Sequence, residues 1–202
     1  FLGHPRGLAV LANGGKLPEP HIVTAVRNTS GIERKLTVAD EQQVVKPETA
    51  EAATYFFENA RVLGVRLGPI LVQLPPSMKK DTGRLEAFLA GIPADIALAF
   101  EFRHPTWLGE DVTAVLASRG AARCAADTDE EGGGESPFAE LVATGSFGYL
   151  RLRRDAYGPG ELEAWLAKVR AMPWGEAWIF FKHEDGARGP AWARRMGELA
   201  SA

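Results

Sequence analysis

Short apolar segments recur along this sequence at a nearly constant spacing, with helix-like segments between them. The centres of the last five apolar segments lie 25 to 29 residues apart. Two parallel strands must be joined by a crossover connection, usually an α-helix, and a strand, a helix and the next strand together need about this length. The spacing therefore predicts a run of βαβ units whose parallel strands form an open sheet or a barrel.

The apolar segments have the composition of strands that helices cover on both faces. Each is short and nearly continuously apolar, whereas strands that are wet on one face alternate apolar and polar residues. The predicted strands lie at residues 21–26, 67–74, 95–102, 121–127, 147–153 and 176–182. The intervening segments repeat apolar residues with the period of an amphipathic helix. The predicted helices lie at residues 47–63, 81–91, 111–118, 160–172 and 190–199.

Two architectures can hold such units, and the sequence favours the barrel. No glycine-rich phosphate-binding fingerprint follows any predicted strand, which weakens a dinucleotide-binding open sheet. A complete (β/α)8 barrel takes about 250 residues and eight strands, whereas this chain has 202 residues and begins with Phe1 rather than Met. We therefore predict a single α/β domain over residues 1–202. It is expected to be a TIM-type barrel with about six parallel strands and the first two βα units missing.

The composition argues against several classes of protein. The formal net charge is −3, so no general basic field supports nucleic acid binding. The single cysteine, Cys124, allows no internal disulfide and no cysteine-rich metal site, and we expect it to be a buried strand residue. No apolar run approaches the roughly 20 residues of a membrane span, and no signal peptide is visible. A cytoplasmic protein without a membrane partner is therefore expected.

Polar side chains collect at the carboxyl ends of the predicted strands, whereas the amino ends lack this enrichment. In a parallel α/β fold all carboxyl ends lie on one side, where ligands bind. Carboxylates there can act as general acids or bases, and arginines can bind a carboxylate or phosphate through two hydrogen bonds. We predict Glu101 and Asp127 as catalytic residues and a substrate-binding set of Gln73, Arg103, His104, Arg151 and Lys182.

The segment AFEFRHPTWLG, residues 99–109, brings three polar residues to the end of one apolar strand. Because side chains alternate along a strand, Glu101 and Arg103 are expected to face the barrel lumen, and the two phenylalanines to face the helices. Glu101 has two interpretations: a structural ion pair with Arg103 or Arg151, or an acid or base tuned by apolar surroundings. His104 falls on the other face, which favours a structural role at the turn.

The other candidates also carry alternatives. Gln73 is interpreted as a neutral group that orients substrate or satisfies loop backbone. Arg151 is hard to bury without a carboxylate or an anion nearby, whereas Arg153 and Arg154 are interpreted as solvated side chains. Lys182 and His183 are either anion or metal contacts or part of the start of a plain charged helix.

Three classes of function follow from these residues. The first is an enzyme that acts on a small anionic or polyhydroxylated substrate, such as a sugar phosphate, held by the arginines. The second is a metal-dependent hydrolase or nuclease, which requires Glu101, His104, Asp127 and His183 to converge on one ion. The third is a non-catalytic binding or scaffold protein in which the charged groups form closed ion pairs. No cofactor and no oligomeric state is predicted.

Segments over most of the chain resemble a known family. They are LGPILVQLPPSMKKDTGRLEAFL, AFEFRHPTWL, CAADTDE, FGYLRLRRDAY, ELEAWL and AWIFFKHEDGARGPAWA. Together they are similar to the YecE-like family of uncharacterised bacterial and archaeal TIM-barrel proteins (domain of unknown function seventy-two). The resemblance runs from about Glu58 to the end of the chain. It implies the barrel fold, the missing first two βα units and a set of recurring positions, but no reaction. These positions are Gln73, Glu101, Arg103, His104, Asp127 and Arg151.

Overall fold

The structure is a computed structural model and describes residues 16–17, 25–27, 33–35, 42–43, 47–129, 134–182 and 188–202. The chain divides into two compact units. One comprises Phe1–Gly68 with Gly83–Ile96, and the other Pro69–Thr82 with Ala97–Ala202. The single domain expected over residues 1–202 stays a prediction. Within the described part of the chain, no helix has the length and apolar character needed to cross a bilayer.

The first unit contains short antiparallel strand pairs and two helices. Strand β1 (Lys16–Leu17) pairs with β4 (Gln42–Gln43), and β2 (Ala25–Arg27) pairs with β3 (Glu33–Lys35). Helix α2 (Pro47–Arg61), the 3-10 turn η1 (Gly64–Arg66) and helix α3 (Thr82–Gly91) follow. Among the described residues of this unit, the buried hydrophobic side chains are Phe57, Leu85, Leu89, Ile92 and Ile96.

The prediction of a parallel strand at residues 21–26 is wrong for its described part. Ala25–Arg27 lies antiparallel to Glu33–Lys35, with Ala25 opposite Lys35. Only five residues, 28–32, connect the two segments, and a connection this short can join antiparallel strands but not parallel ones. Residues 21–24 lie outside the described residues.

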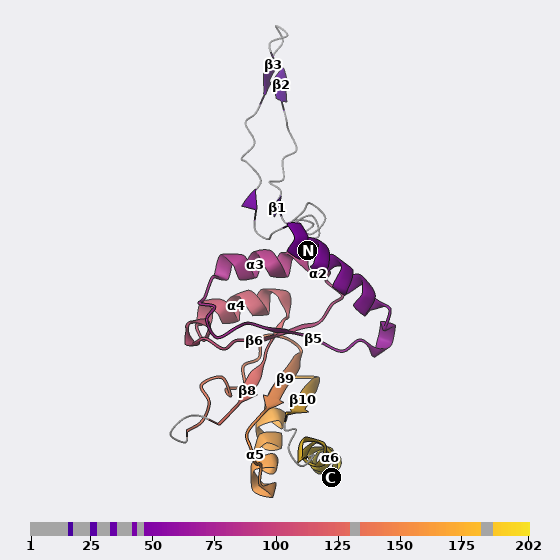
Figure 1. Ribbon diagram of the computed structural model, residues 1–202, viewed down its shortest axis with the longest axis vertical. Coiled ribbons are helices and arrows are strands. Elements are labelled where there is room, and N and C mark those ends of the chain that lie inside the picture. Colours follow the sequence, from indigo (N-terminus) through magenta and orange to yellow (C-terminus); the bar gives the residue numbers. More distant parts are fainter. Residues whose placement is uncertain are drawn as a thin grey trace. The chain divides into compact units, whose positions relative to one another are not determined.

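The second unit holds the parallel strands (Figure 1). Strands β5, β6 and β7 form one three-stranded sheet, and β8, β9 and β10 form another, with every pair parallel. This confirms the parallel α/β class. Among the described residues, the parallel strands form two open sheets and not a closed barrel. The strands are β5 (Ile70–Gln73), β6 (Leu98–Glu101), β7 (Ala122–Arg123), β8 (Ala125–Asp127), β9 (Phe147–Leu152) and β10 (Glu176–Phe181).

Strands β7 and β8 occupy one predicted strand and are separated by a single residue, Cys124. Its backbone N–H donates to the carbonyl oxygen of Phe100 at 2.8 Å, after which the chain leaves β6 and pairs with β9. Cys124 is 4% exposed, as the sequence predicts. The change of partner at this residue brings the two three-stranded sheets together along one stretch of chain.

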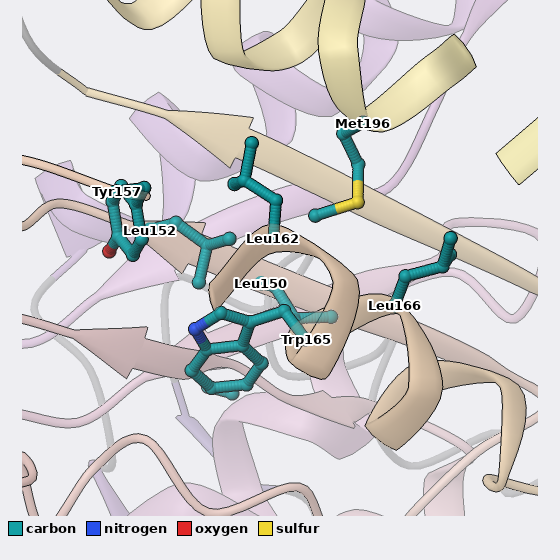
Figure 2. Packing of buried hydrophobic residues seen from close by; sticks show 8 residues of the cluster. Leu150, Leu152, Tyr157, Leu162, Trp165, Leu166 and Met196 are labelled. Carbon is teal, nitrogen blue, oxygen red and sulfur yellow. The ribbon is translucent and has the colours of Figure 1, made fainter. Parts of the chain in front are cut away.

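One face of β9 packs against helices α5 (Pro159–Arg170) and α6 (Arg188–Ser201) (Figure 2). Leu150 and Leu152 are fully buried there, and the cluster also contains Leu162, Trp165, Leu166 and Met196. Because strand side chains alternate, Tyr149 and Arg151 must face the other way. A second cluster lies on that other face and contains Ala99, Ala122, Cys124, Phe147 and Tyr149, packed against Leu71 and Trp178.

The end of β6 is shaped by Pro105, as the sequence predicts. The 3-10 turn η2 (Pro105–Trp107) follows the strand, and helix α4 (Glu110–Arg119) follows the turn. The ring of Trp107 stacks on Phe102 with 4.8 Å between centroids, and its Nε1 donates to the carbonyl oxygen of Met78 at 2.8 Å. These contacts fix the conformation of the segment that directly follows Glu101.

Two glycine substitutions give a matched test of this packing. A Cβ at Gly148 in β9 would overlap the ring of Trp174, whereas a Cβ at Gly197, which is exposed on α6, meets nothing. We expect Gly148→Ala to lower the free energy of unfolding by about 1–3 kcal/mol through overpacking. Gly197→Ala should raise it by up to about 1 kcal/mol, because alanine favours the helix. Urea unfolding measures both; equal effects would contradict the packing of Trp174 on β9.

Candidate functional site

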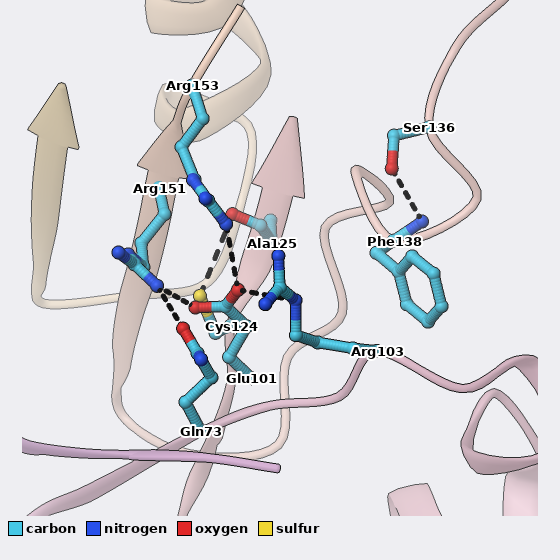
Figure 3. A network of polar contacts seen from close by, with 9 residues as sticks. All are labelled: Gln73, Glu101, Arg103, Cys124, Ala125, Ser136, Phe138, Arg151 and Arg153. Carbon is cyan, nitrogen blue, oxygen red and sulfur yellow. Dashed lines mark hydrogen bonds and ion pairs between the residues drawn. The ribbon is translucent and has the colours of Figure 1, made fainter. Parts of the chain in front are cut away.

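Glu101 is the buried centre of a network of charged groups (Figure 3). Its side chain is only 1% exposed, and three guanidinium groups surround its carboxylate. Arg151 donates to Oε2, Arg153 Nη1 lies 3.4 Å from Oε1, and Arg103 Nε lies 3.8 Å from the same oxygen. A buried carboxylate needs such partners, because removing a charge from water without compensation costs several kcal/mol.

Strand register explains why these residues meet. Gln73 at the end of β5 lies opposite Glu101 at the end of β6, and the Nη1 of Arg151 donates to Gln73 Oε1 at 2.8 Å. Arg151 and Arg153 come from β9 and the residue just after it, on the face that points away from the helices. The network thus joins the carboxyl ends of three strands, where the sequence places the ligand site.

Small residues on the intervening strand make room for the arginines. Between β6 and β9 run β7 and β8, so the arginines span two strand spacings, about 10 Å. On this face the chain between them presents Ala122, Cys124 and Ala126. Larger side chains there would fill the space through which the guanidinium groups of Arg151 and Arg153 reach Glu101.

The network carries more positive than negative charge. One carboxylate faces three guanidinium groups, so the set has a formal charge of +2 in a chain whose net charge is −3. Arg103 has 36% of its side chain exposed, against 18% for Arg151 and 17% for Arg153. The Nε of Arg153 is buried and has no hydrogen-bond partner among the described residues. Donors therefore remain for a further acceptor.

A cavity of about 280 Å³ opens beside the network. Glu101, Arg103 and Arg153 line it on one side, and its other walls are Pro76, Phe102, Ala126, Thr128 and Phe138. Its volume lies just below the range of about 300 to 1,000 Å³ that is typical of small-ligand sites, so it suits a small ligand. The excess positive charge and this cavity together favour a small anion.

The pKa values of two neighbouring groups reflect the same surroundings. Burial, and secondly the charge of Glu101, raise the pKa of the Cys124 thiol, so the thiol stays protonated at neutral pH. Burial also raises the pKa of Tyr149, with Cys124 adding to the shift and Arg151 opposing it. Tyr149 therefore lies within electrostatic range of the network, on its apolar side.

Asp127, a predicted catalytic residue, does not join Glu101. It alternates onto the helix side of β8, where its Oδ2 accepts hydrogen bonds from Arg154 Nε and the Tyr157 hydroxyl, both at 2.8 Å. Arg154 also contacts Glu161 at 2.9 Å. These contacts hold the loop after β9 against the start of α5. Burial, and further Asp127 itself, raise the pKa of Tyr157, which therefore stays protonated.

A larger surface hollow of about 950 Å³ lies beside Asp127 and Arg154. Its lining includes five carboxylates, against two cationic side chains. The carboxylates are Asp127, Asp129, Glu135, Glu140 and Glu161, and the cations are Arg154 and Lys168. This balance repels an anion, and we do not place the site there.

Two further predicted residues lie outside the network. His104 Nδ1 accepts a hydrogen bond from the backbone N–H of Thr106 at 3.2 Å and caps η2, which agrees with a structural role at the turn. Lys182 follows β10, where its backbone N–H donates to the Leu152 carbonyl oxygen at 3.0 Å. Its side chain is exposed and forms no hydrogen bond or ion pair with the rest of the described chain.

Sequence reasoning missed Arg153, which it interpreted as solvated. The structure buries most of this side chain and pairs it with Glu101. The available signal was the period of two in β9, since Arg153 follows Arg151 on the same face. Tyr157 was also missed, and no local pattern marks it as the partner of Asp127.

The metal alternative finds no geometric support in the described residues. They contain no group of three or more His, Cys, Asp or Glu side chains that could hold a metal ion. Glu101, His104 and Asp127 enter three different sets of contacts. His183, the fourth residue of that hypothesis, lies outside the described residues.

Comparison with known proteins identifies the family. The family model described as "Protein of unknown function DUF72" matches residues 23–202. The chain belongs to this family. The resemblance to YecE-like proteins is thereby confirmed. No curated protein matches the chain.

Solved structures of DUF72 family proteins are similar in fold. One, from Thermotoga maritima, has a TM-score of 0.61 at 20% identity, over 77% of this chain and 66% of that one. Another, from Enterococcus faecalis, has a TM-score of 0.56 at 14% identity, over 79% of this chain and 68% of that one. The chain thus spans about two thirds of the length of these DUF72 structures, and at these identities the likeness concerns the fold.

The burial of Glu101 leads to a stability prediction. Glu101→Gln removes the compensating charge from three clustered guanidinium groups, so we expect the free energy of unfolding to fall by about 3 kcal/mol. The matched control is Glu135→Gln, since that side chain is 92% exposed; it should change stability by less than about 0.5 kcal/mol. Guanidinium unfolding measures both. Equal stability of wild type and Glu101→Gln would contradict a compensated buried carboxylate.

Glu161 leads to a pH prediction. The backbone N–H of Gly158 donates to its carboxylate at 2.8 Å, and this bond together with Arg154 lowers the pKa of Glu161 below its ordinary value of 4.5. A carboxyl whose pKa is lower in the folded state stabilises the fold above the unfolded value and loses that contribution as the pH falls. We expect Glu161→Gln to be less stable than wild type at pH 7.

The stability difference for Glu161→Gln should shrink as the pH falls below 4.5. Unfolding curves from pH 7 to pH 3 measure it, with Glu163→Gln on the same helix as control. A difference that stays constant over this range would contradict the assignment.

Proposed function

We propose that this DUF72 protein acts on a small anionic substrate, of the phosphate or sugar-phosphate type, at the carboxyl ends of β5, β6 and β9. The observation that carries the proposal is the net charge of +2 around Glu101, beside a cavity of about 280 Å³. A purely structural network would need one cation for its one carboxylate, and here there are three. The unpartnered Nε of Arg153 supports the same conclusion.

Each residue of the site has a proposed part. Arg103 and Arg153 line the cavity and bind the anionic group, with Arg103 the more exposed of the two. Arg151 shares the binding of the anionic group with these two arginines, and Gln73, which accepts a hydrogen bond from Arg151, orients the substrate. Glu101 is the one carboxylate of the network, so it positions the arginines and is the group available for proton transfer to a substrate.

The remaining predicted residues have supporting parts in this proposal. Lys182 lies at the rim and attracts the anion, because alternation from Phe180 places it on the same face of β10 as the network. His104 and Asp127 hold the loops after β6 and β9 through the contacts described above. The fold itself is proposed to be part of a TIM-type barrel, because within each three-stranded sheet every parallel strand lies beside the next one in the sequence.

A binding test on Arg103 examines the proposal. Inorganic phosphate at ten times its Kd should stabilise the wild type by about 1.4 kcal/mol, which corresponds to roughly 3 °C in melting temperature. Arg103→Ala should lose this gain while folding normally, because its contact with Glu101 is 3.8 Å long and over a third of its side chain is exposed.

Controls separate specific binding from general charge effects. Chloride at equal ionic strength corrects for screening, and glucose tests a neutral polyhydroxylated substrate. Arg195→Ala removes one exposed positive charge from α6 and should respond to phosphate as the wild type does. If phosphate at millimolar concentration does not stabilise the wild type, or if Arg103→Ala responds equally, the proposed function is wrong.

A further inference from the structure

An exposed aromatic ring lies next to the arginine network. Phe180 in β10 is in register with Arg151 in β9, and it is 45% exposed. Its neighbours in sequence, Ile179 and Phe181, pack into the helix-side cluster. Phe180 therefore alternates onto the same face as Arg151, one strand away from it.

Phe180 forms one half of a stacked pair whose other half is buried. Its ring stacks on Tyr149 with 5.1 Å between centroids and 28° between planes. Tyr149 is 7% exposed and belongs to the apolar cluster beneath the network, with Trp178 packed against it. One side of the Phe180 ring is thus supported by protein, while much of the ring remains accessible.

We propose that the substrate of this site carries a flat, unsaturated ring beside its anionic group, and that Phe180 stacks on that ring while Arg151 and its neighbours bind the anion. The inference rests on the proposed function and adds the chemical class of the substrate. Phe180 in β10 and Arg151 in β9 lie on neighbouring strands, which are about 4.8 Å apart. A ligand whose ring and anionic group are separated by one or two bonds therefore reaches both of these side chains. Aromatic rings prefer offset or edge contacts at 4.5–7 Å, worth roughly a few-fold to ten-fold in affinity.

Three phosphonates of equal charge type isolate the contribution of the ring. Phenylphosphonate has a flat ring, cyclohexylphosphonate has a ring of similar size that is not flat, and methylphosphonate has none. We expect phenylphosphonate to bind about five-fold more tightly than methylphosphonate, with cyclohexylphosphonate closer to methylphosphonate. Isothermal titration calorimetry measures the three dissociation constants, and the carbon–phosphorus bond protects the probes from hydrolysis.

Substitution of Phe180 locates the contribution. Phe180→Leu keeps an apolar side chain but removes the flat ring, so it should abolish the five-fold gain and leave methylphosphonate binding unchanged. Phe56→Leu is the matched control, because Phe56 is 53% exposed in the other unit and should alter no dissociation constant. Circular dichroism and melting temperature verify that both variants are folded.

The outcomes distinguish this inference from the proposed function. If methylphosphonate binds but phenylphosphonate gains nothing, or if Phe180→Leu keeps the gain, the ring inference is wrong and the anion site stands. If no phosphonate binds and phosphate does not stabilise the wild type, both are wrong. Native mass spectrometry tests a second copy as the occupant: a dimer that Phe180→Leu dissociates would also overturn the inference, because the ring would be covered by protein.

Discussion

The arrangement of the second unit depends on burying one carboxylate, Glu101, under three arginines. A charge taken out of water must be compensated by partners with good geometry, and no single strand can supply them. The partners come from β9, two strands away, and from the residues that follow β6 and β9. The carboxyl ends of the strands must therefore stay close together. The same interaction leaves two positive charges in excess, which is the basis for an anion site at this position.

Alternation along the strands divides the second unit into a side that packs against α5 and α6 and a side that holds the arginine network. In β9, Leu150 and Leu152 fill the core under α5 and α6, while Tyr149 and Arg151 face the network. Asp127 shows how strict this division is. It comes one residue after Ala126, which faces the network, so its own side chain lies on the helix side. There it binds Arg154 and Tyr157 and cannot reach Glu101.

Much of the parallel fold was predictable because its signals are local. Apolar runs and the 3.6-residue period placed five strand segments and five helices close to their observed bounds, and Pro105 correctly ended its strand. The parallel pairing predicted for the strand at residues 21–26 was wrong, because an apolar run does not indicate which strand it pairs with or in which direction. The five-residue connection after it was the better evidence. The prediction for Arg153 was wrong because two consecutive arginines at the end of a strand are typical of solvent-exposed side chains. Its burial depends on Glu101, which comes from a different strand.

The sequence by itself determined the parallel α/β class, the end of the strands at which polar groups gather, and the face shared by Glu101 and Arg103. Each of these follows from spacing and alternation within one segment. Only the tertiary structure decided which charges meet: that Arg151 and Arg153 reach Glu101, that Asp127 does not, and that Phe180 lies exposed beside Arg151. These contacts join residues about 30 to 50 positions apart. They depend on strand register and on the small residues at Ala122, Cys124 and Ala126, which no local pattern specifies.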